Sequence, residues 1–527
     1  MRFILLSLTV LLYTSCGDFL EESSQDNDYV RTWKDLNELL IGGCYMEVNT
    51  TASQAFAVES NKGMFLHLLA DEVEENNFGG RHFDDHEHVF GYLTWQQRSG
   101  MKESYTDYYA ENNMWTKVYK NINVANNILK SVQDVPQVME SEKEGAARVA
   151  AEAHFLRAFY YFWLVNVYAN PYNPHTASTD LGVPVKTSEQ VLDVKFERNS
   201  VQEVYDLVVS DLLAAEEEMS HVTKERHSMY RADMNSIRLL LSRVYLYLQN
   251  WEKAAQYARM VIQDHPQLMN MNDDTNYFST KSNPENIFSM GGDDLQEMFD
   301  PAVQALRVSK DLYSQYSLND LRRDRWYYTY GAFTGLTKRK GAFDYLSVKY
   351  EKTDMNWYNM YYTTYLSARA DVSSLFWLRS AEAYLNLAEA EAYMGHEDES
   401  RSALNTLRKA RYDKNATDVM VTATGSDLVT AVRKERRMEL ALEGHRWFDL
   451  RRYRVCSVQP EKISITHNYS LYKERGQYEI IETRQFVLEE EDPGWTLPIP
   501  HEVLEFNTGM PNNETKWRDY TVVPTVE

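Results

Sequence analysis

Cysteine is nearly absent from this chain, with only three among 527 residues. Folds that depend on disulfide bonds carry many cysteines at close spacing. Apart from Cys16, near the N-terminus, only Cys44 and Cys456 occur. A disulfide framework is therefore excluded and the core has to supply the stability, while the sequence leaves open whether these two cysteines pair with each other.

Positive charge is also scarce. The chain has 55 Lys and Arg against 78 Asp and Glu, which gives a formal net charge of −23. Binding to nucleic acid or to an anionic lipid surface requires Lys and Arg clustered on one face. The balance disfavours both classes of partner and indicates neutral or polar ligands instead.

Long hydrophobic runs are missing except at the start, where an apolar stretch extends from Phe3 to Tyr13. It is shorter than the roughly 20 residues that span a bilayer, and it follows a single basic residue, as in a secretory signal peptide. Thr14 and Ser15 before Cys16 resemble the lipobox of bacterial lipoproteins, with Tyr13 in place of the usual Leu. We expect residues 1–15 to be a signal peptide, Cys16 to carry the lipid anchor, and residues 16–30 to form an acidic tether.

Recognised catalytic motifs are absent as well. The chain contains no GxSxG elbow, Walker loop or dinucleotide fingerprint. Glycosidase carboxylates have no characteristic spacing, so a secreted hydrolase is neither supported nor excluded.

Possible metal ligands gather in RHFDDHEHVF (81–90). The spacing is not that of HExxH, and no second cluster complements it, which favours a polar surface loop over a metal site. Asp/Asn runs at 270–276 and 291–297 lack the EF-hand spacing. We therefore expect no cofactor and no metal, with structural calcium as an alternative that no specific motif supports.

Helical periodicity is what the sequence has in abundance. Apolar residues recur at three- and four-residue steps from Asn112 to Val132 and from about Ser200 to Met219, and residues 145–168 are Ala-rich and apolar nearly all round. Residues 236–266 and 375–411 have the small and large residues of tetratricopeptide helix pairs. The predicted fold class is mainly α: a tetratricopeptide-like α-solenoid at about 112–265 and 375–453, within a single domain spanning 31–527.

Two regions depart from that pattern. Residues 266–374 lack sustained periodicity, and their 326–365 segment is dense in Tyr, Trp and Phe. A long irregular excursion from a repeat scaffold is usually functional or disordered, and the aromatic content argues against disorder. From 454 to 527 the pattern changes to alternation, which predicts a hairpin turning near Glu474–Gly476 and a tail that becomes briefly helical.

Aromatic side chains are the candidate ligand contacts, because sugars stack their C–H faces on Trp or Tyr while Arg and amide groups bind the hydroxyls. Most of the 37 Tyr and 11 Trp are expected to pack in the core. The predicted contacts lie in the 81–98 segment and in the aromatic-rich segment; they are Arg81, Trp95, Trp326, Tyr327, Trp357 and Tyr358.

The segment RKERRMELALEGHRWFDLRRY (433–453) looks most like an active site or a basic contact surface. Its acids interleave its bases, and no nucleophile accompanies His445. Three- and four-residue steps predict pairing of Arg436 with Glu439, Glu443 with Arg446, and Asp449 with Arg452. Leu440, Leu442, Trp447, Phe448 and Leu450 give it an apolar side, so the pattern favours a salt-bridged structural segment over an active site or a nucleic-acid contact.

Taken together, these segments resemble the SusD/RagB lipoproteins of Bacteroidetes. The resemblance is carried by CGDFLEE (16–22), EAHFLRAFYYFWLVNVYANP (152–171), GVPVKT (182–187), WLRSAEAYLNLAEAEAYMG (377–395), the 433–453 segment and LPIP (497–500). The chain departs from the family pattern at Val503, where Glu is usual, and in its last residues.

The resemblance implies that the 433–453 segment is a buried ion-pair clasp without ligand contact, whose signature residues are Arg436, Glu439, Glu443, Gly444, Arg446, Trp447 and Asp449. It also implies an outer-membrane, lipid-anchored protein on the extracellular face. It further implies non-catalytic binding of an oligosaccharide and its delivery to a SusC-like TonB-dependent transporter. Peptide or another polymer as ligand is the alternative on the same architecture, followed by a secreted hydrolase and a structural adaptor.

Overall fold

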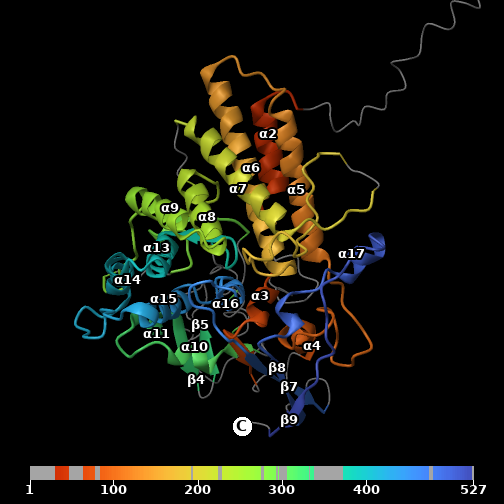
Figure 1. Cartoon of the computed structure of the whole chain (residues 1–527), viewed down its shortest axis with the longest axis vertical. Coiled ribbons are helices and arrows are strands. Elements are labelled where there is room, and N and C mark those ends of the chain that lie inside the picture. The colour runs from red at the N-terminus through yellow and green to blue at the C-terminus, as the bar shows by residue number, and fades with distance from the viewer. Residues whose placement is uncertain are drawn as a thin grey trace, which may run out of the picture.

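The computed structural model describes residues 30–46, 63–76, 83–190, 194–223, 228–273, 278–291, 295, 299, 306–330, 333–336, 372–473 and 479–524. Within this part the chain is mainly helical, as predicted. Long helices fill the upper part of Figure 1, and the labelled short strands lie in the lower part.

The upper part is a bundle built around one long buried helix. Its members are α2 (Trp33–Leu39), the π-helical turn η2 (Leu40–Cys44), α5 (Asn113–Ser131), α6 (Glu140–Tyr168) and α7 (Val201–Ser220). Helix α6 packs against α2, α5 and α7, so its sides are buried from Gly145 onward. Small residues allow this close approach: a Cβ on Gly145 would lie 2.3 Å from the Trp33 ring. The Ala-rich composition of α6 therefore reflects helix packing on every side.

Two helix pairs continue from the bundle, at the positions that the repeat spacing predicts. They are α8 (Met234–Tyr247) with α9 (Trp251–Asp264), and α13 (Ser380–Met394) with α14 (Glu397–Arg411). The same bond joins each pair: Ser242 Oγ donates to the Ala254 carbonyl at 2.9 Å, and Ser400 Oγ donates to the Ala388 carbonyl at 2.7 Å. Because α9 packs directly on α13, the two pairs form one stack although more than a hundred residues separate them in sequence.

The connecting region contributes short elements. These are α3 (Phe65–Leu69), β1 (Val73–Glu75), α4 (Phe83–Leu93), β2 (Asn286–Ser289), β3 (Leu306–Val308), α10 (Lys310–Ser314), α11 (Leu321–Trp326), β4 (Tyr327–Tyr330), β5 (Phe333–Leu336) and β6 (Trp377–Arg379). The strands pair antiparallel in twos: β1 with β3, β2 with β6, and β4 with β5. Residues 83–90 belong to helix α4, so our prediction of a polar loop across 81–90 is wrong for these residues.

The C-terminal part begins with α15 (Gly425–Glu439) and α16 (Arg446–Arg454) and then forms an antiparallel sheet in the order β7 (Ile465–Tyr472), β8 (Ile480–Leu488) and β9 (Thr521–Val523). The predicted hairpin is thus confirmed, while its turn lies outside the described residues. A 3₁₀ turn, η5 (Pro493–Trp495), and a short helix, α17 (His501–Phe506), precede β9.

The two faces of this sheet differ in what they contact. On one face His467 lies opposite Phe486 and Tyr469 lies opposite Arg484; on the other Asn468 lies opposite Gln485. The first face packs on α4, since Tyr469 and Phe486 both contact the Phe90 ring. Strand alternation therefore directs Asn468 and Gln485 away from α4 and toward the polar cavity described below.

Candidate functional site

The 433–453 segment folds as two helices with a turn between them. Among its signature residues, Arg436 and Glu439 are 0% exposed, and Glu443, Trp447 and Asp449 are also buried. Arg446 is more accessible, with 14% of its side chain exposed. The prediction of a buried, paired cluster is confirmed, and Trp447 stacks on Trp495 of the tail at 5.2 Å.

The partners, however, differ from two of the three predicted pairs. Asp449 does bind Arg452 at 2.8 Å. Arg436 binds Asp449 at 2.9 Å instead of Glu439. Glu443 binds Arg379 at 2.9 Å, and Arg446 binds Asp71 at 2.7 Å. The two predictions are wrong for different reasons. Because α15 ends at Glu439, the helical steps on which the Glu443–Arg446 pair rests do not continue through the turn. Arg436 and Glu439 both lie in α15, but Arg436 donates to Asp449 and Asn386, while Glu439 accepts from arginines of other elements.

Glu439 forms the centre of the ion-pair clasp, which we define as Glu439 with Arg322, Arg379 and Arg411. Its two oxygens accept from Arg322 Nη1 at 2.8 Å, Arg379 Nη1 at 2.7 Å and Arg411 Nη2 at 2.8 Å. Burial alone would raise the pKa of Glu439, but the charges of Arg411, Arg379 and Arg322 outweigh burial and hold it below its usual range.

Each arginine of the clasp comes from a different element, so the clasp ties α11, β6 and α14 to α15. Further carboxylates complete the charge balance around these guanidinium groups: Asp320, Glu435, Glu285 and Glu443. Each of these groups is bonded to at least one other member of the network, and none of them lines either of the two cavities described below. The segment that most resembles an active site is therefore a fold-holding element.

The turn after α15 is held in a strained conformation. Leu442 has φ +61° and Gly444 has φ +75°. A Cβ at Gly444 would lie 2.6 Å from Leu375 Cδ2, which explains the glycine. The backbone N–H of Leu442 donates to the buried carboxyl of Glu72 at 3.1 Å. Burial raises the pKa of Glu72 to about 8, which favours the protonated carboxyl at neutral pH.

Two of the predicted ligand contacts lie in the core. Trp326 is 0% exposed, with its ring 4.6 Å from Phe278. Tyr327 is 2% exposed, and its hydroxyl lies 2.9 Å from that of Tyr316. A side chain covered on all sides cannot stack on a ligand, so both predictions are wrong. They failed because the alternation of aromatic and polar residues that suggests a binding loop here belongs to α11 and the buried start of β4.

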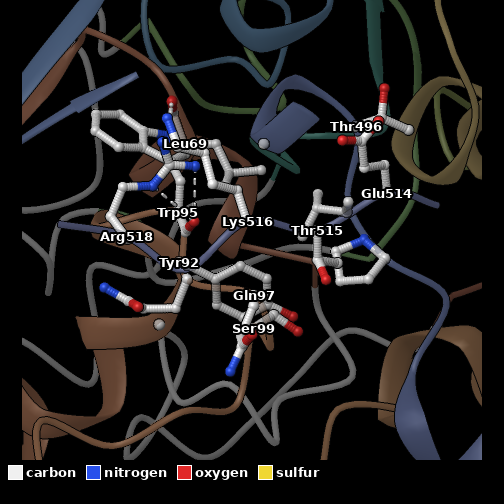
Figure 2. A pocket seen from close by; sticks show the side chains of 15 residues that line it. Leu69, Tyr92, Trp95, Gln97, Ser99, Thr496, Glu514, Thr515, Lys516 and Arg518 are labelled. Atoms are coloured by element: carbon white, nitrogen blue, oxygen red, sulfur yellow. Dashed lines mark hydrogen bonds between the residues drawn. The ribbon is translucent and has the colours of Figure 1, made fainter. Parts of the chain in front are cut away.

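Trp95 lines a cavity, shown in Figure 2, but it is almost completely buried. Its indole Nε1 donates to the Leu69 carbonyl at 3.1 Å, and its ring stacks on His467 at 4.6 Å. The cavity holds about 20 Å³, which is room for a single water molecule. The ring therefore does not face a space of sugar size.

The backbone of Trp95 has a distinct role. Its φ of +50° is unusual for a residue other than glycine. Arg518 stabilises this conformation, since its Nη2 donates to the Trp95 carbonyl at 3.1 Å and to Asp492 at 2.8 Å (dashed lines in Figure 2 join Arg518 to Trp95). The Trp95 turn is thus the anchor point for the C-terminal segment.

Four predicted residues lie outside the described part of the chain: Cys16, Arg81, Trp357 and Tyr358. The histidine-rich segment is described only in part. Within it, His86 Nε2 lies 2.9 Å from Glu75 and its ring stacks on Tyr469. Across the described residues, no group of three or more His, Cys, Asp or Glu side chains is placed to bind a metal. Cys44 and Cys456, both buried, are free thiols.

A larger cavity lies where β1–β3 meets β7–β8, and we call it the polar cavity. Its volume is about 200 Å³, and its lining includes Glu74, Arg307, Lys310, Asn468, Thr483 and Gln485. Arg307 Nε donates to Glu74 at 2.8 Å, and Gln485 Nε2 donates to Asn468 Oδ1 at 3.3 Å. Amide, hydroxyl and charged side chains thus line the polar cavity, and such groups can form hydrogen bonds with hydroxyl-bearing ligands.

Sequence reasoning missed this cavity. Its walls come from strands separated by more than 150 residues, and none of its residues belongs to a motif. The available signal was the alternation in β7 and β8, which indicates that Asn468 and Gln485 share a face but not what that face meets.

Comparison with known proteins places these features in context. A model described as "SusD family" matches residues 249–517, and one described as "Starch-binding associating with outer membrane" matches residues 18–246. SusD-like protein P38 of Formosa agariphila is 25% identical over 392 residues, covering 66% of this chain and 72% of that protein.

Solved structures agree on the fold. A putative sugar binding protein from Bacteroides vulgatus has a TM-score of 0.67 at 19% identity, covering 92% of this chain and 98% of its own. A SusD superfamily protein from Bacteroides thetaiotaomicron has a TM-score of 0.66 at 20% identity, covering 92% and 100%.

Proposed function

This chain belongs to the SusD family, and we propose that it binds an oligosaccharide or glycan without catalysing its breakdown. The observation that carries the proposal is the pair of family models, which together extend from residue 18 to residue 517 and of which one is described as starch-binding. One structural neighbour is described as a putative sugar binding protein, which is in keeping with this proposal.

The polar cavity supports a binding role. Its amide and hydroxyl groups are suited to sugar hydroxyls, and it is about ten times as large as the cavity beside Trp95. A glycosidase requires a pair of carboxyl groups, one of them available as a proton donor. Here Glu74 is paired with Arg307, and Glu75 accepts bonds from Ser470 and His86. Both carboxyl groups are thus committed to structural partners, which favours binding over hydrolysis.

The setting that we propose is the cell surface. Acylated at Cys16, the protein is anchored to the outer membrane on its extracellular face, and it passes captured glycan to a SusC-like TonB-dependent transporter. The description of one family model, which mentions association with the outer membrane, supports the location. Among the described residues, no helix is both long and apolar enough to cross a membrane. We propose no cofactor.

Affinity electrophoresis against amylopectin, xylan, arabinan, glucomannan and pectin tests the proposal, with calorimetry on any polysaccharide that retards the protein. Binding with a dissociation constant in the micromolar to low millimolar range, without release of reducing sugar, is expected. Retardation by none of them, together with binding of a casein digest, would identify a peptide ligand instead. Steady release of reducing ends would identify an enzyme.

Replacement of Asn468 and Gln485 together by Ala tests the polar cavity. The double variant should lose at least tenfold in affinity for the polysaccharide that binds the wild type, because two hydrogen-bonding groups are removed. The anchor is tested separately: Cys16→Ala protein should leave the membrane fraction, and its retention there would contradict the lipoprotein assignment.

A further inference from the structure

Tryptophan exposure singles out one residue of the described chain. Trp517 is 51% exposed, whereas every other described tryptophan is buried or half-buried. An exposed indole does not gain the free energy that burial of its ring would provide. Exposed tryptophans are therefore enriched where a ligand or partner covers the ring. Trp517 lies in the C-terminal segment, within the part of the chain that departs from the family pattern.

The segment around Trp517 is rigidly held. The next residue, Arg518, points inward and is 3% exposed, with bonds to Asp492 and to the Trp95 carbonyl. On the other side, Asn513 Nδ2 donates to the Tyr168 carbonyl at 2.8 Å and the Leu497 carbonyl at 2.6 Å. Because its neighbours are fixed to the core, Trp517 is presented to solvent with little conformational freedom to lose on binding.

Trp517 is also part of a group of aromatic rings that Arg484 connects. Its ring lies 5.2 Å from that of Tyr105, and Arg484 lies over both Tyr105, at 5.9 Å, and Tyr520, at 4.4 Å. Tyr520 is 40% exposed. The backbone of Tyr105 has φ +62°, which is strained for a tyrosine. Strained backbone conformations of this kind are concentrated at functional sites. We call Tyr105, Trp517 and Tyr520, with Arg484, the aromatic ledge.

The surroundings of the ledge indicate a sugar rather than a protein as its occupant. The exposed parts of the three rings amount to roughly 200–300 Å², estimated from the area of whole aromatic side chains. A stable protein interface needs about 800 Å² on each partner. The charge of Arg484 is balanced by Glu482, whose carboxylate lies 2.5 Å away, so the ledge arginine is not free to pair with an anionic partner. One or two sugar rings match this area and this neutrality.

From this geometry we propose that the aromatic ledge is a glycan contact of the protein, on which pyranose rings stack against Trp517 and Tyr520. The proposal rests on the proposed function and adds a residue set to it. The ledge lies on the α4 side of the β7–β8–β9 sheet, through Arg484, while the polar cavity lies on the opposite side, through Asn468 and Gln485. The two sites are therefore separate and can be tested separately.

Trp517→Ala, Trp517→Phe and Tyr520→Ala variants of the whole chain test the ledge against the polysaccharide that most retards the wild type. We expect at least a tenfold loss of affinity for Trp517→Ala, a smaller loss for Tyr520→Ala, and a loss within about threefold for Trp517→Phe, which keeps a ring. Phe506→Ala is the matched control, because Phe506 is an aromatic residue on α17 that is 83% exposed and lies outside the ledge. It should bind like the wild type.

The outcomes separate this proposal from the proposed function. A wild-type protein that binds a polysaccharide, with a Trp517→Ala variant that binds equally well, would overturn the ledge and leave the proposed function standing. A wild type that binds no polysaccharide overturns both. If Trp517→Ala loses co-purification with the transporter while its glycan affinity is unchanged, the ledge is a protein contact and the proposal is wrong. Protection of tryptophan emission from acrylamide by the polysaccharide, lost in Trp517→Phe, would support it independently.

Discussion

Glu439→Gln is the sharpest test of the ion-pair clasp. The carboxylate of Glu439 is completely buried and accepts bonds from Arg322, Arg379 and Arg411. Glutamine has nearly the same shape, but one of its two terminal atoms is an NH₂ donor. That group would face guanidinium donors, so the substitution removes a negative charge and turns part of the attraction into donor–donor conflict.

The magnitude follows from the bonds that are lost. Arg411 alone contributes Nε at 2.9 Å to one carboxylate oxygen and Nη2 at 2.8 Å to the other. Whichever oxygen is replaced, at least two charge-assisted hydrogen bonds disappear, each worth roughly 1.5–3 kcal/mol. Breaking a buried ion pair by removing one partner costs about 3–5 kcal/mol. We therefore expect the free energy of unfolding to fall by about 4 kcal/mol at pH 7.

Urea unfolding followed by tryptophan fluorescence measures this loss. Glu140→Gln is the control: it is the same substitution at a side chain that is 89% exposed and lies 3.5 Å from Lys143, so it should cost less than about 1 kcal/mol. A loss below 1 kcal/mol for Glu439→Gln, equal to the control, would refute the reasoning. The pH dependence provides a second check. Because the pKa of Glu439 is held below its usual range, its contribution is present at neutral pH and disappears in acid, so the two proteins should converge in stability as pH falls.

Three further predictions concern the turn, its buried carboxyl and the core. Gly444→Ala should destabilise the protein by roughly 2–4 kcal/mol in urea unfolding, and clearly more than Gly395→Ala. Both glycines have positive φ, but only at Gly444 would the added Cβ meet a neighbouring side chain. Equal losses of stability in the two variants would contradict the steric account. Glu72→Gln should be neutral near pH 4 and stabilising by up to about 5 kcal/mol near pH 9, because a folded pKa of about 8 against an ordinary 4.5 makes wild-type stability fall as pH rises between these values. Parallel pH–stability curves of the two proteins would show that the carboxyl is not protonated. Trp326→Ala should cost about 3–5 kcal/mol in stability with unchanged glycan affinity of the folded protein, and a selective loss of affinity in calorimetry would restore Trp326 as a ligand contact.

Much of the fold could be predicted from the sequence because helical periodicity is a local property. The apolar stripes at 112–132 and 200–219 became α5 and α7, and the small residues at 236–266 and 375–411 became two bonded helix pairs. Burial of the 433–453 segment was correctly inferred, because acids interleaved with bases next to a Trp–Phe pair are typical of a charged segment docked on a core.

The sites could be predicted far less well. Because the ligand contacts were chosen among aromatic residues by composition, Trp326 and Tyr327 were predicted to lie at a ligand surface, although both are buried in the core. Trp517 was not chosen, because it stands alone in a polar tail. The polar cavity was missed because Glu74 and Gln485 meet only after β1, paired with the distant strand β3, packs against the β7–β8 hairpin.

The sequence by itself determined where helices form, that disulfides do not carry the fold, and which family the chain resembles. These properties depend on residues that are neighbours along the chain. Tertiary structure alone decided that Glu439 binds Arg322, Arg379 and Arg411 rather than Arg436, and that Trp517 is exposed while Trp326 is not. The reason is physical: which charges pair and which rings remain uncovered depend on segments brought together from up to several hundred residues apart, and local spacing contains no record of that packing.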